Sequence, residues 1–258
     1  PRQCGVNRSA GQRGFCGGGD RALVAKAMRH FWEEPVLAGS GGSGAVFFGG
    51  CTLGCRYCQN RAISGAPVGA PMDSAGLRAV MEDLIAQGAE NIDLVTPTQF
   101  LPALLPALTP KLPVPVVYNC GGYERVETLR ALEGAVDIYL PDMKYADNAL
   151  AARLSGAPDY FETAAAAITE MVRQTGSVRW EGEKIVRGVL IRHLILPGQV
   201  ENSLKVLDWI GEQFAPGQVL VSLMRQYTPM PGMTPPLDRP ITEEEYEAVL
   251  SWMYLNRL

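Results

Sequence analysis

The sequence lacks the features of a membrane-spanning, secreted or nucleic-acid-binding protein. Its 258 residues contain no run of about 18 apolar residues, the length that a membrane-spanning helix needs. No secretory signal pattern opens the chain, and a formal net charge of −4 provides no broad basic surface for nucleic acid. We therefore expect a cytoplasmic protein with no membrane partner and no nucleic-acid partner.

Cysteine does not occur after Cys120, and the chain contains a single C-x2-C pair. A structural zinc site commonly uses two such pairs, so this pattern disfavours paired zinc knuckles. A ferredoxin-type cluster needs four cysteines, and Cys120 is the only downstream candidate for the fourth. Six cysteines in all, three of them closely spaced, fit a reducing compartment better than a disulfide scaffold.

The most informative feature that is present is the group Cys51, Cys55 and Cys58, spaced C-x3-C-x2-C. It follows an apolar run at Ala45–Phe48, with Gly49-Gly50 as a hinge. Three thiolates can hold three irons of a cubane [4Fe–4S] cluster and leave the fourth iron without a protein ligand. Spacing and strand-end context therefore predict an open-iron cluster. A non-catalytic metal-binding module is the alternative from another functional class.

Strand-like apolar runs alternate with helical patterns along the rest of the chain. Continuous apolar runs are typical of parallel strands that are covered on both faces. Strand followed by helix, six times, predicts parallel βα units, which are too few to close an eight-stranded barrel. We therefore expect an α/β fold, a partial (β/α)6 three-quarter barrel of the TIM type, over residues 45–258. The six runs are Ala45–Phe48, Asn91–Val95, Val114–Asn119, Val136–Leu140, Val189–Ile195 and Val219–Met224.

Capping signals predict where several helices begin and end. The clearest helical pattern covers Leu77 to Ile85, with Asp73 or Ser74 as its N-cap and Gly88 as its terminator. A last helix begins at Thr242, whose partner Glu245 completes a capping box. Two further helices are predicted at Asp159–Gln174 and Asn202–Phe214.

Residues 1–44 are rich in glycine and are predicted to form a separate N-terminal segment. We expect a short helical stretch near Ala22–His30 and a flexible connector at Gly39–Gly44. Cys4 and Cys16 alone cannot complete a closed metal site, so they are interpreted as free or loosely paired thiols in a surface loop.

Several segments in combination resemble the radical S-adenosylmethionine (SAM) superfamily. Within it they look most like a poorly characterised branch related to pyruvate formate-lyase activating enzyme, and the resemblance runs nearly end to end. It implies that the open iron binds the amino and carboxylate groups of SAM. One electron would then cleave the sulfonium and release a 5′-deoxyadenosyl radical. The segments are Glu33-Glu34-Pro35, Cys51–Asn60 (CTLGCRYCQN), Thr96-Pro97-Thr98, Tyr118–Glu124 (YNCGGYE), Val136–Tyr145 (VDIYLPDMKY) and Ile191–Gly198 (IRHLILPG).

The resemblance implies SAM-binding roles for five residues besides the cysteines. Tyr57 matches a residue whose backbone helps to hold adenine, and Asn60 matches an asparagine that contacts the nucleoside. Asp142 and Lys144 resemble an Asp-x-Lys pair that holds the ribose and carboxylate regions, where nearby backbone groups bind a monovalent cation. Arg192 resembles an arginine that shares the SAM carboxylate with that lysine. A lysine is a suitable point-charge partner for a carboxylate in a partly desolvated cleft.

The sequence departs from the family pattern at two places, one that would bind the SAM ammonium and one that is typical of activating enzymes. Thr96-Pro97-Thr98-Gln99 replaces the Gly-Gly-Glu that receives the SAM ammonium, so the Thr96 hydroxyl and strand-edge carbonyls are the expected substitutes. The histidine expected after the sixth strand is missing. The remaining candidates are interpreted structurally, with His193 as a hydrogen-bonded histidine and Cys120 as a small buried hydrophobe.

The resemblance also implies partners, namely an electron donor such as flavodoxin or ferredoxin and a substrate that loses a hydrogen atom. Without cysteines beyond Cys120, the auxiliary clusters of many peptide-modifying members are not expected. The leading expectation is activation of a glycyl radical enzyme, whose backbone glycine is the substrate. A tailoring enzyme for a small molecule or peptide is the alternative. A protein substrate needs a wide cleft beside the cluster, predicted to be bordered by Tyr118, Tyr123 and Gln226–Met233.

Overall fold

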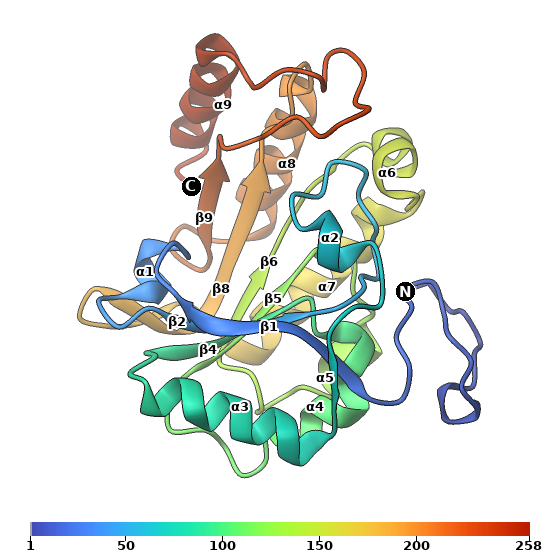
Figure 1. The fold of residues 1–258 in the computed structure, drawn as a ribbon. Helices are drawn as coiled ribbons and strands as arrows, with labels where there is room; N and C mark the ends of the chain where they lie inside the picture. The colour runs from blue at the N-terminus through green and yellow to red at the C-terminus, as the bar shows by residue number, and fades with distance from the viewer. Residues whose placement is uncertain (1) are drawn as a thin grey trace.

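A mixed β-sheet runs through the centre of the computed structural model, which describes residues 2–258 (Figure 1). Within these residues the sheet has nine strands, in the order β3-β1-β2-β4-β5-β6-β8-β7, with β9 pairing β8. The strands are β1 Ala22–His30, β2 Ser43–Phe48, β3 Ala70–Met72, β4 Asn91–Val95, β5 Val116–Cys120, β6 Ile138–Pro141, β7 Arg179–Glu181, β8 Lys184–Leu194 and β9 Leu220–Met224.

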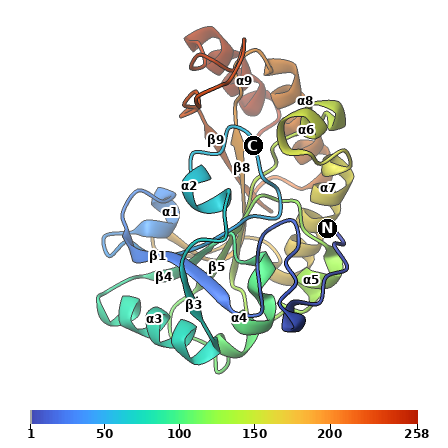
Figure 2. The same ribbon diagram turned by 45° about the vertical axis from the view of Figure 1, so that its right-hand side comes forward.

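The strands β2, β4, β5, β6, β8 and β9 are neighbours in chain order, and each pairs with the next in parallel. All six strands predicted from apolar runs are therefore confirmed, with bounds that shift by a few residues. The longest helices lie on the outside of the curved sheet (Figures 1 and 2). The helices are α1 Pro35–Ala38, α2 Arg61–Ser64, α3 Ser74–Ala86, α4 Leu101–Ala107, α5 Val126–Arg130, α6 Asn148–Ser155, α7 Tyr160–Thr175, α8 Val200–Gln213 and α9 Glu243–Leu255.

The predicted helix near Ala22–His30 is wrong, because this segment is strand β1. It pairs antiparallel with β2 on one side and with β3 on the other. Backbone pairing along nine residues outweighs the weak helix preference of its alanines and methionine. The sheet is consequently mixed, whereas the sequence predicted a purely parallel one. The boundary predicted between residues 44 and 45 stays a prediction, although it falls inside β2 (Ser43–Phe48), which pairs with β1.

Local capping signals predicted the helix ends well. The Asp73 side chain accepts the Gly76 N–H at the start of α3. At the start of α9, Thr242 and Glu245 form the predicted reciprocal capping box. These caps satisfy backbone N–H groups that have no partner inside the helix. Within residues 2–258, none of the helices combines the length and the apolar character that crossing a membrane requires.

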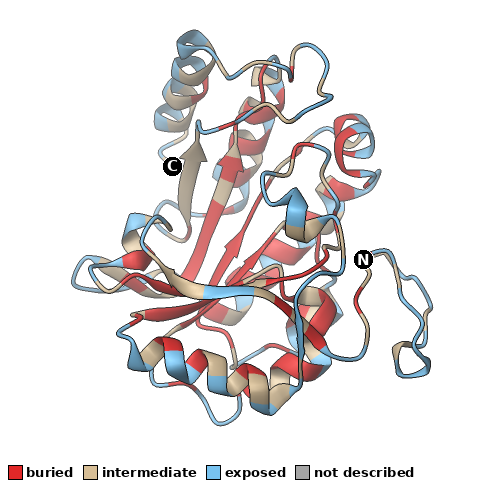
Figure 3. Ribbon diagram, in the orientation of Figure 1, coloured by how far each residue is buried: buried red, intermediate tan, exposed pale blue. Residues whose placement is uncertain are grey.

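The inner face of the curved sheet carries an apolar layer, and α1 covers it. Leu37 of α1 is 2% exposed and packs in one cluster with Val117, Leu140 and Leu190 from three neighbouring parallel strands. Figure 3 shows these strands as the most continuously buried part of the fold. Burying a leucine side chain stabilises a fold by about 1.5–3 kcal/mol. The burial of Leu37 thus stabilises the packing of α1 against the inner face of the sheet.

A polar layer begins two residues further along the same strands. Side chains alternate between the two faces of a strand, so Asn119 of β5 and Arg192 of β8 lie on the same face as Val117 and Leu190. Asp142 follows β6 and forms an isolated parallel bridge with Arg192. The polar layer therefore lies toward the carboxyl ends of the parallel strands, the end where barrels of this kind carry their chemistry.

Candidate functional site

The three clustered cysteines lie in a loop that follows β2 at its carboxyl end. The chain turns sharply at Gly50, whose φ is +77°. A Cβ at this position would lie 2.0 Å from the carbonyl oxygen of Cys16, so a residue other than glycine cannot be accommodated without movement of the backbone. Gly50 therefore allows the start of the cysteine loop to pack closely against the backbone of the N-terminal segment.

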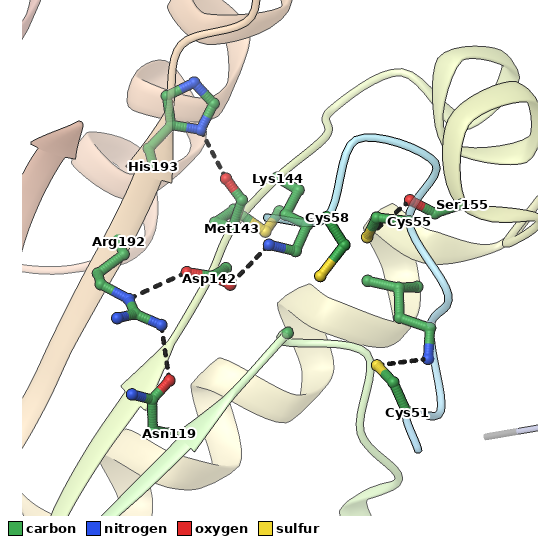
Figure 4. A network of polar contacts seen from close by, with 12 residues as sticks. Cys51, Cys55, Cys58, Asn119, Asp142, Met143, Lys144, Ser155, Arg192 and His193 are labelled. Atoms are coloured by element: carbon green, nitrogen blue, oxygen red, sulfur yellow. Dashed lines mark hydrogen bonds and ion pairs between the residues drawn. The ribbon is translucent and has the colours of Figure 1, made fainter. Parts of the chain in front are cut away.

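The sulfur atoms of Cys51, Cys55 and Cys58 lie around one region, with the Lys144 ammonium beside it (Figure 4). Each sulfur accepts a hydrogen bond, from Leu53 N–H to Cys51 (3.3 Å), from Ser155 Oγ to Cys55 (3.1 Å) and from Ser64 Oγ to Cys58 (3.2 Å). Hydrogen bonds to ligand sulfurs tune iron–sulfur clusters. Three sulfurs on one loop, each with a donor, fit the cubane cluster that the spacing predicts.

The Cys51 and Cys55 thiols are protonated in the absence of iron. Burial raises the pKa of Cys55 to about 11, against the opposing attraction of the Lys144 ammonium. Burial also raises the pKa of Cys51, although N–H groups of Gly54 and Leu53 oppose it. Iron binding must therefore displace these protons. No group of three or more His, Cys, Asp or Glu side chains in the described residues is placed to bind a single metal ion. A cubane cluster does not require such a group, because each of its cysteine ligands binds a different iron.

Asp142 forms ion pairs with Lys144 and Arg192, the two cations that were predicted to bind SAM. Its carboxylate accepts Lys144 Nζ at 2.6 Å and Arg192 Nε at 3.1 Å. Burial favours the neutral acid, but the two cations outweigh burial and lower the pKa of Asp142. Asp142 in turn raises the pKa of Lys144 against burial. The three predicted residues are thus brought together, in their charged forms, on the inner face of the sheet.

Arg192 has two further partners that sequence reasoning missed. Its guanidinium donates to Asn119 Oδ1 at 2.6 Å and to Glu33 Oε1 at 3.4 Å. Glu33 precedes α1 and reaches into the polar layer from the N-terminal segment. The Glu33-Glu34-Pro35 motif was recognised from the sequence, but its place beside β8 depends on how the chain folds back.

Asp93 is a second residue that the sequence did not single out. It is fully buried on β4, and its Oδ2 accepts Asn119 Nδ2 at 3.3 Å. Its Oδ1 has no hydrogen-bond partner among residues 2–258. Burial, reinforced by the neighbouring Glu33 carboxyl, raises the pKa of Asp93 well above its usual range. Burial likewise raises the pKa of Glu34, against a hydrogen bond from Ser222. An alternating pattern in Asn91–Val95 is the only local signal that could have indicated Asp93.

The other predicted SAM-binding residues lie in different environments. Tyr57 is 5% exposed, and its hydroxyl is hydrogen bonded to that of Tyr145 at 2.7 Å, so its side chain is part of the core. Asn60 is exposed and precedes α2 without a capping hydrogen bond. Thr96 has a φ of +59°, a left-handed conformation that is strained for a β-branched residue, and such strain often marks functional sites. The roles of these three residues stay predictions.

The structural interpretations of His193 and Cys120 agree with the geometry. His193 is fully buried, with Nδ1 2.6 Å from the Met143 carbonyl and Nε2 2.8 Å from Ser203 Oγ. Cys120 is 3% exposed and belongs to the main apolar core. Cys4 and Cys16 are both free thiols, as expected. Cys16, however, is buried rather than at the surface, because the cysteine loop packs over it.

The cleft predicted from the sequence is wrong at two of its borders. Tyr118 is fully buried and donates to Thr98 Oγ1 at 2.8 Å. Tyr123 is 4% exposed and donates to Asp159 at 2.5 Å. Both side chains belong to the apolar core. Strand alternation turns Tyr118 of β5 away from the inner face, whereas Tyr123 lies in the loop that follows β5. The third border does reach the cysteine loop, where Gln59 Nε2 donates to the Gln226 carbonyl at 3.0 Å.

Arg2, in the N-terminal segment, binds the cysteine loop, and no local pattern in the sequence predicts this contact. Its guanidinium donates to the carbonyls of Thr52, Leu53 and Ser155, each at 2.9 Å, and also to that of Gly156. The same guanidinium lies over the Phe15 ring, 4.1 Å from its centroid. Charged hydrogen bonds are stronger than neutral ones. Arg2 therefore holds both the Cys51–Cys55 loop and the end of α6, which supplies the hydrogen bond to Cys55.

Comparisons with known proteins agree with this geometry. A family model described as "4Fe-4S single cluster domain" matches residues 37–99, which contain the three cysteines. Uncharacterized protein MJ0674 of Methanocaldococcus jannaschii is 29% identical over 265 residues, covering 96% of this chain and 71% of that protein.

Solved structures of three enzymes share the fold. Methylornithine synthase (PylB) has a TM-score of 0.55 at 16% identity and is matched over 84% of this chain and 63% of its own. SuiB of Streptococcus suis, bound to its precursor peptide SuiA, scores 0.53 at 13% identity, over 80% and 44%. The radical SAM methyltransferase TsrM of Kitasatospora setae, with tryptophan and a SAM analogue, scores 0.50 at 14% identity, over 71% and 36%. The chain thus spans less than two thirds of each. These likenesses show a fold similar to that of radical SAM enzymes, and with the family model they support that superfamily.

Proposed function

We propose that this chain is a radical SAM enzyme, with Cys51, Cys55 and Cys58 as ligands of a [4Fe–4S] cluster. The observation that carries the proposal is the meeting of three hydrogen-bonded sulfurs with the Lys144–Asp142–Arg192 charge network at one end of the parallel strands. When bound, the cluster supplies the electron that cleaves SAM to a 5′-deoxyadenosyl radical. We further propose that the six parallel strands act as a three-quarter (β/α)6 barrel, with residues 1–44 as an accessory segment.

The chain's own residues would bind and orient SAM. Lys144 is 15% exposed at its side chain, and we propose that it pairs with the SAM carboxylate. Gly121 lies close to both the loop and this lysine, since a Cβ there would be 3.2 Å from Leu53 Cδ2 and 3.7 Å from Lys144 Cε. A carboxylate at Lys144 would therefore also lie next to the cysteine loop. Thr96, Asn60 and the Tyr57 backbone remain the proposed contacts for the ammonium and the nucleoside, and a monovalent cation beside Asp142 remains an expectation.

The proposed reaction removes a hydrogen atom from a substrate, with flavodoxin or ferredoxin as the electron donor. Activation of a glycyl radical enzyme remains one candidate for the substrate step. The burial of Tyr118 and Tyr123 removes part of the cleft on which that candidate depended. A tailoring reaction on a small molecule or peptide is the second candidate, favoured by the fold shared with a methylornithine synthase and a peptide-bound enzyme.

The experiment that tests the proposal is anaerobic reconstitution with iron and sulfide, followed by reduction in the presence of SAM. We expect a charge-transfer absorption, a reduced-cluster spectrum that changes on adding SAM, and 5′-deoxyadenosine among the products. Cys55→Ser should abolish the cluster and the product, because one iron loses its anionic ligand. Cys4→Ser, a change at an exposed thiol, is the matched control and should retain both. Cys55→Ser protein that cleaves SAM at the wild-type rate would contradict the cluster assignment, and a stable cluster without any SAM cleavage would favour the non-catalytic module.

The substrate candidates can be separated with the reconstituted enzyme. A glycyl radical enzyme from the same genomic neighbourhood should acquire a protein-based radical signal in the presence of SAM and reductant. Deuterium transfer from a small-molecule or peptide pool into 5′-deoxyadenosine, with no protein radical, would favour the tailoring reaction instead.

A further inference from the structure

Three arginines without a carboxylate partner surround the outside of the cysteine loop. Arg56 lies between Cys55 and Cys58, Arg61 is the first residue of α2, and Arg153 lies near the end of α6. All three are exposed, and no ion pair within residues 2–258 involves any of them. We call Arg56, Arg61 and Arg153 the arginine patch.

Backbone contacts bring the arginine patch together from two parts of the chain. The Arg56 N–H donates to the Leu154 carbonyl at 2.8 Å, which places Arg56 next to Arg153. Arg61 Nη1 donates to the Arg56 carbonyl at 3.3 Å. Arg56 and Arg153 also line a common cavity of about 210 Å³, together with the segment 233–237. The three arginines of the patch therefore lie together on the surface beside the loop.

The charge of the patch contrasts with the rest of the protein. The chain carries a formal net charge of −4, and exposed arginines such as Arg173, Arg225 and Arg239 are paired with glutamates. Other exposed arginines, such as Arg179, also lack an ion pair among the described residues, but the patch brings three unpaired arginines together. Neighbouring like charges without counter-charges repel one another, so they favour an anionic partner. Three guanidinium groups are also well suited to carboxylates, which they can bind in bidentate geometry.

The position of the patch indicates what kind of anionic partner it fits. Arg56 belongs to the cysteine loop itself, and Arg153 is two residues from Ser155, which donates to Cys55 Sγ. A protein docked on the patch would lie against the outside of this loop, so an electron would pass from it to the site through the loop that carries the three cysteines. Weak electron-transfer encounters use small interfaces of less than about 1,200 Å², and complementary charge speeds such encounters.

We propose that the arginine patch is the docking surface for a small acidic one-electron carrier protein, with carboxylates around its own redox group. The proposal rests on the proposed function and adds a place for its electron donor. In the docked pair, one electron leaves the reduced carrier and enters the oxidised cluster. The carrier is oxidised by one electron, the cluster is reduced by one, and no bond forms or breaks.

The test compares two reductants on the reconstituted holoenzyme by stopped-flow spectroscopy. Reduced flavodoxin is the acidic protein carrier, and photoreduced 5-deazariboflavin is a small reductant that needs no docking surface. In the double variant Arg56→Glu/Arg153→Glu we expect the rate with flavodoxin to fall at least about tenfold at low salt, since charge steering changes association rates by about 10–1,000-fold. The rate with deazariboflavin should stay within about twofold of wild type. Arg179→Glu, at an exposed arginine on β7, is the matched control and should change neither rate.

Salt and graded variants provide a second measurement. The wild-type rate with flavodoxin should fall steeply as salt rises, because exposed charges are screened. Arg56→Gln/Arg153→Gln, which removes charge without reversing it, should give an intermediate rate and a shallower salt dependence. Equal flavodoxin rates in wild type and both double variants would overturn the docking surface. Loss of inorganic pyrophosphate binding in these variants, with an unchanged flavodoxin rate, would overturn it in favour of a small-anion site.

Failure of the proposed function gives a different result. If deazariboflavin cannot reduce the wild-type cluster, or reduction yields no 5′-deoxyadenosine, the fault lies with the radical SAM assignment. If deazariboflavin supports 5′-deoxyadenosine formation in every variant and only the flavodoxin rate is insensitive to the charge reversal, the docking surface alone is refuted.

Discussion

Glu124 should make the stability of the fold depend on pH in a way that one substitution can isolate. Its side chain is 2% exposed, and Oε1 accepts Thr98 Oγ1 at 2.8 Å, while Oε2 has no partner within the described residues. Burial raises the pKa of Glu124 to about 7, although the hydrogen bond from Thr98 opposes it. Below about pH 7, the Glu124 carboxyl is therefore mainly protonated in the folded protein.

The sign and the size of the effect follow from linkage. A folded-state pKa above the ordinary 4.5 means that the stabilisation is complete below about pH 4.5 and is lost as the pH rises through about 7. The difference between about 7 and 4.5 corresponds to about 3 kcal/mol at 1.36 kcal/mol per pH unit. His193 acts in the opposite direction, because burial lowers its pKa to about 4, so its stabilisation is lost as the pH falls from 6.5 to 4. The two effects partly cancel in the wild-type protein.

The assay is urea unfolding of the iron-free protein from pH 5 to pH 8, compared between wild type and Glu124→Gln. The His193 contribution is common to both proteins, so it cancels in the difference of their unfolding free energies. That difference should shift by about 3 kcal/mol in favour of the glutamine variant as the pH rises. Glu127→Gln, at a fully exposed glutamate three residues away, should show no such pH dependence. A difference between wild type and Glu124→Gln that stays constant from pH 5 to pH 8 would refute the reasoning.

Three further predictions concern the site itself. Lys144→Ala should weaken SAM binding well over tenfold, measured by calorimetry, and should leave the iron content unchanged. The reason is that losing a charge partner in a desolvated site costs about 2–5 kcal/mol. Equal SAM affinity in the variant and the wild type would indicate that Lys144 has a structural role. Cys120→Ala should keep its cluster spectrum, because the thiol is buried in the core, and a lost cluster would revive the four-cysteine alternative. Arg2→Met should lower iron incorporation and expose the Cys51–Cys58 loop to limited proteolysis. Arg13→Met is the control and should do neither, because the Arg13 side chain makes one exposed hydrogen bond. Equal proteolysis of the two variants would show that Arg2 does not hold the loop.

Features with a local signal could be predicted from the sequence. The parallel strands are short, continuous apolar runs, and the starts of α3 and α9 carry side-chain caps that act within one turn. The cysteine loop is equally local, because its three ligands lie within eight residues. Asp142 and Lys144 could be placed because a parallel strand that ends at Pro141 presents the next residues at the edge of the sheet.

Features that depend on long-range pairing could not be predicted. Strand β1 exists because it finds β2 and β3, and nothing within Ala22–His30 distinguishes that pairing from a helix. Glu33 meets Arg192 across 159 positions of the sequence, and Arg2 meets Ser155 across 153. The burial of Tyr118 could not be predicted, because the face of a strand to which a side chain points is not known until the register of the sheet is known. The burial of Tyr123, in the loop after β5, depends on its contact with Asp159, 36 positions away.

The partners of the two predicted SAM-binding cations distinguish their roles. Each nitrogen group of Arg192 already has an acceptor, in Asp142, Glu33 and Asn119. A SAM carboxylate would have to share or displace one of these acceptors to reach the guanidinium. Lys144 Nζ has three donors and a single partner among residues 2–258, Asp142. Lys144 is therefore the better candidate for direct contact with the SAM carboxylate, and Arg192 is better interpreted as the residue that keeps Asp142 ionised and in place beside it.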